Sequence, residues 1–240
     1  MARNGKRIYG QYCALAVALD VVGERWTLLI VRELLIRPRR YAELLQAFPG
    51  IGTNLLAERL RFLSEHGVVR AVNAGQPRSG YELTERGQAL RDPVLALARW
   101  GFDTMATQAR SGRVEPGWAQ LGVEALIDDA RASDVDEDYV FHVDDDVFTL
   151  SVRNGHASIR PGAADDPAMT IDTDAATLMD VASNNLDPIS ALVANRVTVV
   201  GDADAMPRCL HLLGLYRNFG GSGSTARAGA AQVGVAQVAG

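Results

Sequence analysis

The sequence of 240 residues lacks the features that mark several large classes of protein. It has no apolar run of the roughly 20 residues that a membrane-spanning helix needs. The start, MARNGKRIYGQY, carries charge without an apolar stretch after it, so it does not resemble a secretory signal peptide. Only Cys13 and Cys209 are present, too few for a disulfide framework and typical of a reduced cytoplasm. We therefore expect a cytoplasmic protein that does not bind membranes.

Signatures of catalysis and of metal binding are also missing. No nucleophile–base pair or phosphate-binding loop stands out, so we expect no enzyme activity and no cofactor. The aspartates at 144–146 form a run, but consecutive carboxylates on an extended chain rarely converge on one ion. His142, His156 and His211 show no ligand spacing with Cys209. We therefore expect no metal site and interpret the aspartates as a solvated turn.

A strong charge asymmetry is the first positive feature. Residues 1–112 hold 16 Lys and Arg against 10 Asp and Glu, a balance of +6. Residues 113–240 hold 8 against 19, a balance of -11, which gives the net charge of -5. A basic half can meet nucleic-acid phosphate, whereas an acidic half repels it.

Breaks in the apolar pattern divide the chain into three parts. A helical pattern around Leu90 and Met105 ends near Gly112, and the helix-breaking residues Pro116 and Gly117 follow. After Phe219 almost only small residues remain, which cannot bury enough apolar surface to offset the entropy of ordering. We expect a first domain at 1–112, a second at 113–219 and a disordered tail at 220–240.

Residues 38–83 have the element order of a winged helix-turn-helix. Two short amphipathic helices are predicted at 41–48 and 53–65, with Thr53 or Asn54 as the cap of the second. Strands at 68–72 and 81–83 follow, joined by a polar loop. This fold places its second helix in the major groove of DNA. Apolar helices predicted at 14–22 and after Thr84 offer a dimerisation surface.

The helix predicted at 53–65 has a core face and a polar face. Leu56, Leu60 and Leu63 share one side and are expected to be buried. The candidate DNA-reading residues lie on the other side or at the N-terminal end: Thr53, Asn54, Ala57, Glu58 and Arg61. An arginine can fork onto guanine, an asparagine can pair with adenine, and an alanine methyl can approach a thymine methyl.

Three arginines outside this helix are candidates for phosphate contacts: Arg39, Arg40 and Arg78. The alternative is that all these polar residues form an ordinary solvated surface, which is the more frequent situation for a single arginine. The adjacent turn, the hairpin and the basic half favour DNA contact here. Glu58 acts either as a filter against wrong bases or as a partner of Arg61.

The first domain resembles the HxlR family of winged-helix transcriptional regulators over about residues 12–103. The resemblance rests on ALD at 18–20, GERWTLLI at 23–30, REL at 32–34, RRYAEL at 39–44, PGI at 49–51, LLAERL at 55–60, YELT at 81–84 and Gly87. It implies a homodimeric regulator that binds double-stranded DNA through the helix from Thr53, and we expect a repressor.

Cys13 matches a position at which some members of that family sense electrophiles or oxidants. In this chain Ala14 follows it, where the family commonly has proline. Two interpretations stay open. A cysteine at a helix N-terminus can have a lowered pKa and act as a redox sensor, or it can be an inert, small apolar residue at the start of a buried helix.

The second domain is predicted to be α+β, with an antiparallel sheet covered by helices on one face. We expect helices at 124–132, 174–182, 187–194 and up to Tyr216, and strands at 138–143, 147–153, 156–160, 168–172 and 197–200. This order, with an Asp-Pro helix start followed by a strand and Gly-Asp, resembles the sterol-carrier-protein-like domain.

The resemblance implies an apolar tunnel between sheet and helices that accepts hydrophobic molecules. The candidate lining residues on the helix side are Leu178, Met179, Leu186, Ile189, Leu192, Val193, Leu210 and Leu213. An ordinary core position is the more frequent role for each of them, and the sequence alone does not separate the two. The leading hypothesis is therefore a dimeric DNA-binding regulator with a hydrophobic small-molecule effector. The alternatives are a lipid carrier that uses the winged helix for dimerisation, and a regulator whose second domain only stabilises the dimer.

Overall fold

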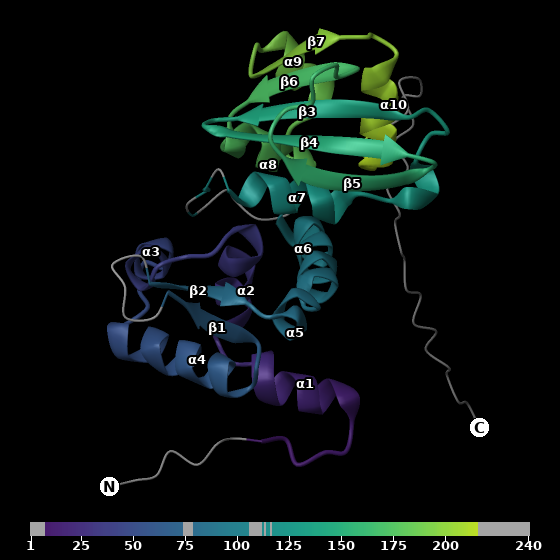
Figure 1. Cartoon of the computed structure of the whole chain (residues 1–240). Helices are drawn as coiled ribbons and strands as arrows, with labels where there is room; N and C mark the ends of the chain where they lie inside the picture. The colour runs from purple at the N-terminus through teal and green to yellow at the C-terminus, as the bar shows by residue number, and fades with distance from the viewer. Residues whose placement is uncertain (1–7, 74–78, 106–111, 113, 116, 216–240) are drawn as a thin grey trace, which may run out of the picture.

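The computed structural model describes residues 8–73, 79–105, 112, 114–115 and 117–215. A mainly helical unit comes from the N-terminal half, and a sheet with helices comes from the C-terminal half (Figure 1). The two units meet where α6 (Arg91–Met105) packs against α7 (Trp118–Leu126). The domain limits at 112, 113 and 219 stay predictions, and the expected tail at 220–240 lies outside the described residues.

The N-terminal unit has the element order expected of a winged helix-turn-helix. In chain order its elements are α1 (Ala14–Val22), α2 (Thr27–Ile36), α3 (Tyr41–Ala47), α4 (Thr53–Glu65), β1 (Val69–Val72), β2 (Gly80–Leu83), α5 (Glu85–Gln88) and α6. The strands pair antiparallel, from Val69 opposite Leu83 to Val72 opposite Gly80. The helix pair α3–α4 is therefore followed directly by the hairpin that forms the wing.

Two details differ from the expected ones. The N-cap residue of α4 is Gly52 rather than Thr53 or Asn54, and no side chain caps this helix. The last helix is interrupted between α5 and α6, and Thr84 caps α5 by accepting a hydrogen bond from the Gly87 amide. Gly87 is needed at this turn, because a Cβ there would collide with the carbonyl oxygen of Val68.

One core holds the N-terminal unit together. It is made of apolar side chains from α2, α3, α4 and the wing, including Ile30, Val31, Leu34, Leu44, Leu56, Leu60, Leu63 and Leu83. The three leucines predicted to face the core from α4 are all buried. Burial of each such side chain stabilises the fold by roughly 1.5–3 kcal/mol, so the orientation of α4 is fixed by its inner face.

The C-terminal unit contains a five-stranded sheet in the order β5-β4-β3-β6-β7. Its strands are β3 (Glu137–Val143), β4 (Asp146–Arg153), β5 (His156–Pro161), β6 (Met169–Thr173) and β7 (Val197–Gly201). The α+β class is confirmed, but the sheet is mixed, because β3 and β6 run parallel. The predicted turn between β4 and β5 is present, and Asn154 and Gly155 both have positive φ, as a tight hairpin requires.

The helices of this unit differ from the expected ones at two ends. A helix predicted at 124–132 is instead α7 (Trp118–Leu126), followed by a short 3-10 turn (Asp129–Arg131). The extended backbone of Ile127 ends α7. The final helix, α10 (Ala205–Leu212), stops before Tyr216, which lies outside the described residues. The other two, α8 (Ala175–Ala182) and α9 (Pro188–Val193), begin after capping aspartates at 174 and 187 as predicted.

The sheet and its covering helices enclose the second core. Its buried members come from β3, β4, β6 and the helices, and include Tyr139, Phe141, Phe148, Leu150, Met169, Val181, Cys209 and Leu212. The rings of Phe141 and Phe148 lie parallel, with centroids 5.1 Å apart. The sheet is therefore packed on its helical side by ordinary core residues.

The helix α7 belongs to both units. Leu121 is buried in the N-terminal core, Ala119 and Val123 are buried in the C-terminal core, and Ala125 packs with Phe102 of α6. One helix that supplies side chains to both cores ties the two units together.

Candidate nucleic-acid interface

The outer face of α4 carries the polar residues that the helical pattern predicted. Asn54, Ala57, Glu58 and Arg61 are exposed, and Thr53 is exposed at the N-terminal end. The Arg61 side chain is 72% exposed, and its Nε lies 3.9 Å from the Glu65 carboxylate, one helical turn away. Its guanidinium is thus held only weakly by the protein.

The turn between α3 and α4 is fixed by a hydrogen bond at its base. The Tyr41 hydroxyl donates to the carbonyl oxygen of Thr53 at 2.7 Å. This bond joins the start of α3 to the start of α4. The outer face of α4 is therefore presented on a rigid pair of helices.

In the structure Glu58 pairs with Arg59, whereas the partner considered from the sequence is Arg61. Its carboxylate lies 3.3 Å from Arg59, which also binds Glu24 at 3.1 Å. The Arg59 side chain is only 15% exposed, so this arginine connects α4 with the segment before α2. The expectation that Glu58 pairs with Arg61 is not met, because Arg59 lies nearer.

Arg39 is not placed to meet phosphate. Its guanidinium donates to the buried Glu33 at 2.9 Å, and its side chain is 18% exposed. Arg40 is exposed and stands at the N-cap of α3, where its backbone amide donates to Glu43. Arg40 therefore remains a candidate for a phosphate contact, whereas the guanidinium of Arg39 is paired with a buried carboxylate.

The wing presents one further arginine that the sequence pattern did not single out. Arg70 on β1 is exposed and forms an ion pair with Glu82 on β2, directly opposite in the hairpin. The predicted contact at Arg78 lies outside the described residues.

Cys13 is exposed in the single chain, and both interpretations of this residue stay predictions. It is the N-cap residue of α1, and the backbone amides of Ala16 and Leu15 lower the pKa of its thiol. Cys209 is the opposite case, since complete burial raises the pKa of its thiol to about 12. The two cysteines of the chain therefore differ in access and in thiolate character.

The eight residues predicted to line a hydrophobic pocket differ in their burial within the C-terminal unit. Leu213 is a core residue, and Leu178, Leu186 and Leu210 pack against the same core. Met179 packs at the α6–α7 junction, Ile189 and Leu192 are half-buried, and Val193 is exposed. None of the eight is among the residues that line the two cavities, of about 420 and 410 Å³, found in the described part of the chain, so this set stays a prediction.

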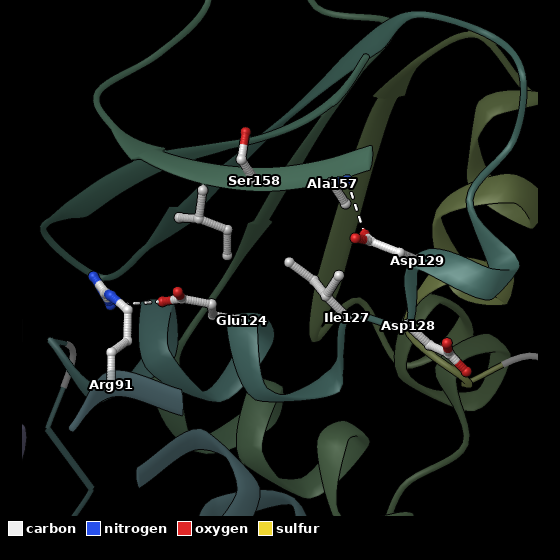
Figure 2. Close-up of a pocket in the computed structure, with 8 residues that line it drawn as sticks. Arg91, Glu124, Ile127, Asp128, Asp129, Ala157 and Ser158 are labelled. Atoms are coloured by element: carbon white, nitrogen blue, oxygen red, sulfur yellow. Dashed lines mark hydrogen bonds and ion pairs between the residues drawn. The ribbon is translucent and has the colours of Figure 1, made fainter. Parts of the chain in front are cut away.

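A cavity of about 420 Å³ lies instead at the junction of the two units. It is lined by Arg91, Glu124, Ile127, Asp128, Asp129, Ala157, Ser158 and Ile159. Figure 2 shows Arg91 and Glu124 paired at one end, Ile127 in the middle and the two aspartates at the other end. The ion pair measures 3.0 Å and joins α6 to α7. The cavity thus adjoins a contact between the units.

Several charged side chains that line this cavity already have partners within the protein. Asp129 accepts a hydrogen bond from the amide of Ala157 at 3.0 Å, and Asp128 pairs with Arg131. Burial raises the pKa of Glu124, and its partner Arg91 offsets part of that shift. A second cavity, of about 410 Å³, is lined by Arg131, Arg208 and His211 together with small residues.

Among the residues that the structure describes, no group of three or more potential metal ligands comes together. No helix among them is long and apolar enough to cross a membrane.

An exposed helix on a rigid helix pair, with a two-stranded wing beside it, defines the class of winged helix-turn-helix proteins. The comparison with known families gives the more specific assignment. Residues 21–109 match the HxlR-like helix-turn-helix family, and residues 120–212 match the SCP-2 sterol transfer family. The chain belongs to the HxlR-like family of transcriptional regulators and carries an SCP-2 domain after it.

Three similar proteins illustrate the relationship. The uncharacterized HTH-type regulator sll1512 of Synechocystis is 32% identical over 102 residues, which cover 42% of this chain and 76% of the relative. The regulator Rv3095 of Mycobacterium tuberculosis is 42% identical over 86 residues, 35% of this chain and 54% of that protein. The chain thus spans about half the length of this mycobacterial relative. The structure of quinone-bound YodB from B. subtilis is 31% identical, covers 36% of this chain and 93% of that chain, and has a TM-score of 0.33.

Proposed function

We propose that this protein represses transcription by binding DNA with the outer face of α4. The observation that carries the proposal is the exposed, weakly held Arg61 beside Asn54 and Ala57, on a helix whose opposite face is buried. Thr53 and Glu58 border the same face, and Arg40 stands ready for phosphate at the start of α3. A protein that acts on DNA must share its compartment, so we place it in the cytoplasm.

The DNA-binding form is a homodimer. The nine-residue apolar helix α1 buries only Ala16 within the chain, and Leu15 and Val17 are exposed. On α6, Leu97 and Trp100 are exposed one turn apart, and Trp100 is 71% exposed. Exposed apolar faces on two helices are typical of an interface between copies. A two-fold dimer also presents two copies of α4 to two half-sites.

The effector site is the cavity between α6, α7 and β5. An effector here combines an apolar part, for Ile127 and Ile159, with a polar group that meets Arg91 or Glu124. Such a molecule competes with the ion pair that joins the units, and so it changes how α6 is held. All the lining residues except Arg91 belong to the SCP-2 domain, which supports a small-molecule ligand of partly hydrophobic character.

The test is binding of the purified protein to DNA from its own upstream region across a salt series. A specific complex tightens steeply as salt falls, because Lys and Arg contacts release counterions from phosphate. Scrambled DNA of equal length is the control and should bind far more weakly. Equal affinity for both DNAs at every salt concentration would refute sequence-specific regulation.

Deletion of residues 113–240 tests the role of the second domain. If that domain only stabilises the dimer, a fused dimerisation helix should restore full DNA affinity to the truncated protein. If it holds an effector, small amphipathic molecules should change the DNA affinity of the whole chain and leave that of the truncated protein unchanged.

A further inference from the structure

A buried carboxylate lies at the contact between the two units. The Glu33 side chain on α2 is only 2% exposed. It accepts hydrogen bonds from Arg32 at 2.9 Å and from Arg39 at 2.9 Å. The third donor is the indole N–H of Trp118, at 2.7 Å. A buried charge depends on all its partners, because losing one leaves charge that water cannot solvate.

Trp118 lies far from Glu33 in the sequence. It is the first residue of α7, 85 positions after Glu33, and it belongs to the helix that enters the SCP-2 unit. The guanidinium of Arg32 lies 3.9 Å from the centre of its ring, so the ring is held from a second side. Gly117, just before it, lies near Ile36 at the end of α2, since a Cβ at this position would be in van der Waals contact with the Ile36 side chain. The start of α7 is therefore fixed on α2 by polar and apolar contacts.

Glu33 also connects to the DNA-binding elements through Arg39. The backbone of Arg39 forms a bridge with the wing: its amide donates to the Tyr81 carbonyl at 3.0 Å, and the Tyr81 amide donates back at 2.8 Å. The next residue, Arg40, is the N-cap of α3. The guanidinium and the backbone of one residue thus tie the buried carboxylate to β2 and to the first helix of the helix-turn-helix.

We propose that Trp118 is a positioning residue for DNA binding, which acts through Glu33 and Arg39 to set the wing and α3 relative to α2. The inference rests on the proposed function, and it adds a route by which the SCP-2 unit controls the shape of the DNA-binding unit within a single chain. The indole N–H fixes the Glu33 carboxylate, the carboxylate fixes Arg39, and Arg39 holds the base of the wing.

Two buried nitrogen atoms of this cluster have no hydrogen-bond partner. The Nε atoms of Arg32 and Arg39 are both buried without a hydrogen-bond partner. Each arginine therefore carries a buried N–H without an acceptor, toward which the Glu33 carboxylate can move when another donor is lost. Removal of the indole N–H should displace the carboxylate and not merely leave one of its oxygen atoms with fewer partners.

The test compares Trp118→Phe with Arg196→Gln in the full-length protein. Phenylalanine keeps an aromatic ring beside Arg32 but removes the N–H donor. Arg196→Gln breaks an ion pair with Asp180 inside the SCP-2 unit and leaves the Glu33 cluster untouched. We expect Trp118→Phe to weaken operator binding roughly tenfold, as the loss of a hydrogen bond to a charged group can, and Arg196→Gln to weaken it far less.

Hydrogen exchange of the Tyr81 amide supplies a readout that does not depend on DNA. In Trp118→Phe this amide should exchange faster, while amides in the core of α4 keep their protection. Uniformly faster exchange would indicate general destabilisation and overturn the proposal. So would a folded Trp118→Phe with unchanged operator affinity and unchanged Tyr81 protection, or equal losses of affinity in both variants. If the wild type shows no preference for any DNA, the proposed function fails, and exchange at Tyr81 still decides the coupling.

Discussion

Replacing Arg61 with alanine separates DNA reading from folding more cleanly than any other change on α4. The side chain is 72% exposed, and its nearest charged neighbour, Glu65, lies at 3.9 Å. An exposed pair of this kind contributes about 0.3–0.5 kcal/mol at most. Alanine also has a better helix propensity than arginine. The free energy of unfolding should therefore change by less than about 0.5 kcal/mol.

The effect on DNA binding should be much larger. A bidentate arginine–guanine contact contributes about 1–3 kcal/mol of discrimination. That range corresponds to a loss of roughly 5- to 150-fold in operator affinity. If Arg61 instead meets phosphate, affinity should fall on all sequences alike, and the salt dependence should lose about one counterion.

Fluorescence anisotropy with the operator and with single-base variants, in a salt series, distinguishes these cases. Glu65→Ala is the matched control, because it removes the partner of Arg61 and leaves the arginine in place. Arg59→Ala is the opposite control, since this buried arginine links Glu24 and Glu58 and should cost stability first. Wild-type affinity and wild-type base preference in a folded Arg61→Ala protein would refute the assignment of α4 as the reading helix.

Three further outcomes are expected. Trp100→Glu should shift the protein from dimer to monomer in sedimentation experiments with little change in melting temperature, and an unchanged dimer would exclude this face of α6. Cys13 should react with iodoacetamide faster than free cysteine at neutral pH, because the pKa of its thiol is lowered. Cys209 should react only after unfolding, because its thiol is buried. A reaction rate at Cys13 equal to that of free cysteine would end the sensor interpretation. Burial raises the pKa of Glu124, so between the ordinary and the raised pKa the folded state binds more protons at this group than the unfolded state. The contribution of Glu124 to the free energy of unfolding should therefore fall as the pH rises through that range. Melting temperatures of Glu124→Gln across that range should lack this slope.

The winged helix was predictable because its signals are local. Leucines repeat along α4 with helical spacing, and the polar residues between them are exposed as the wheel predicted. The same holds for α8 and α9, whose capping aspartates precede an apolar helix directly. Where a pattern is complete within about ten residues, the chain has little choice of structure.

The errors arose where a side chain has a partner far along the chain. Arg39 looks like a free cation in the sequence, and only the fold shows that Glu33 lies buried beside it. Glu58 could be assigned to Arg61 by spacing alone, whereas Arg59 is oriented by Glu24, 35 positions away. The pocket residues stay a prediction, because helix-side apolar positions in a sequence do not distinguish the wall of a pocket from an ordinary core.

The start of α7 could not be predicted for a related reason. Pro116 and Gly117 mark a break in the sequence, which therefore predicts that the helix begins only at residue 124. Trp118 nevertheless opens the helix, because its ring and its N–H are both satisfied by α2. A helix that is anchored by another unit needs less support from its own sequence.

In the mechanism that we propose, the SCP-2 unit influences DNA binding by two routes, and experiments can separate them. The inner face of α6 packs on α7 through Phe102 and Ala125, while its outer face carries Trp100. A change along this route alters the spacing of two α4 helices, which must match half-sites about 34 Å apart. The route through Trp118 and Glu33 acts within one chain. A defect in the first route should therefore appear only on a full two-fold operator, whereas a defect in the second should appear equally on an isolated half-site.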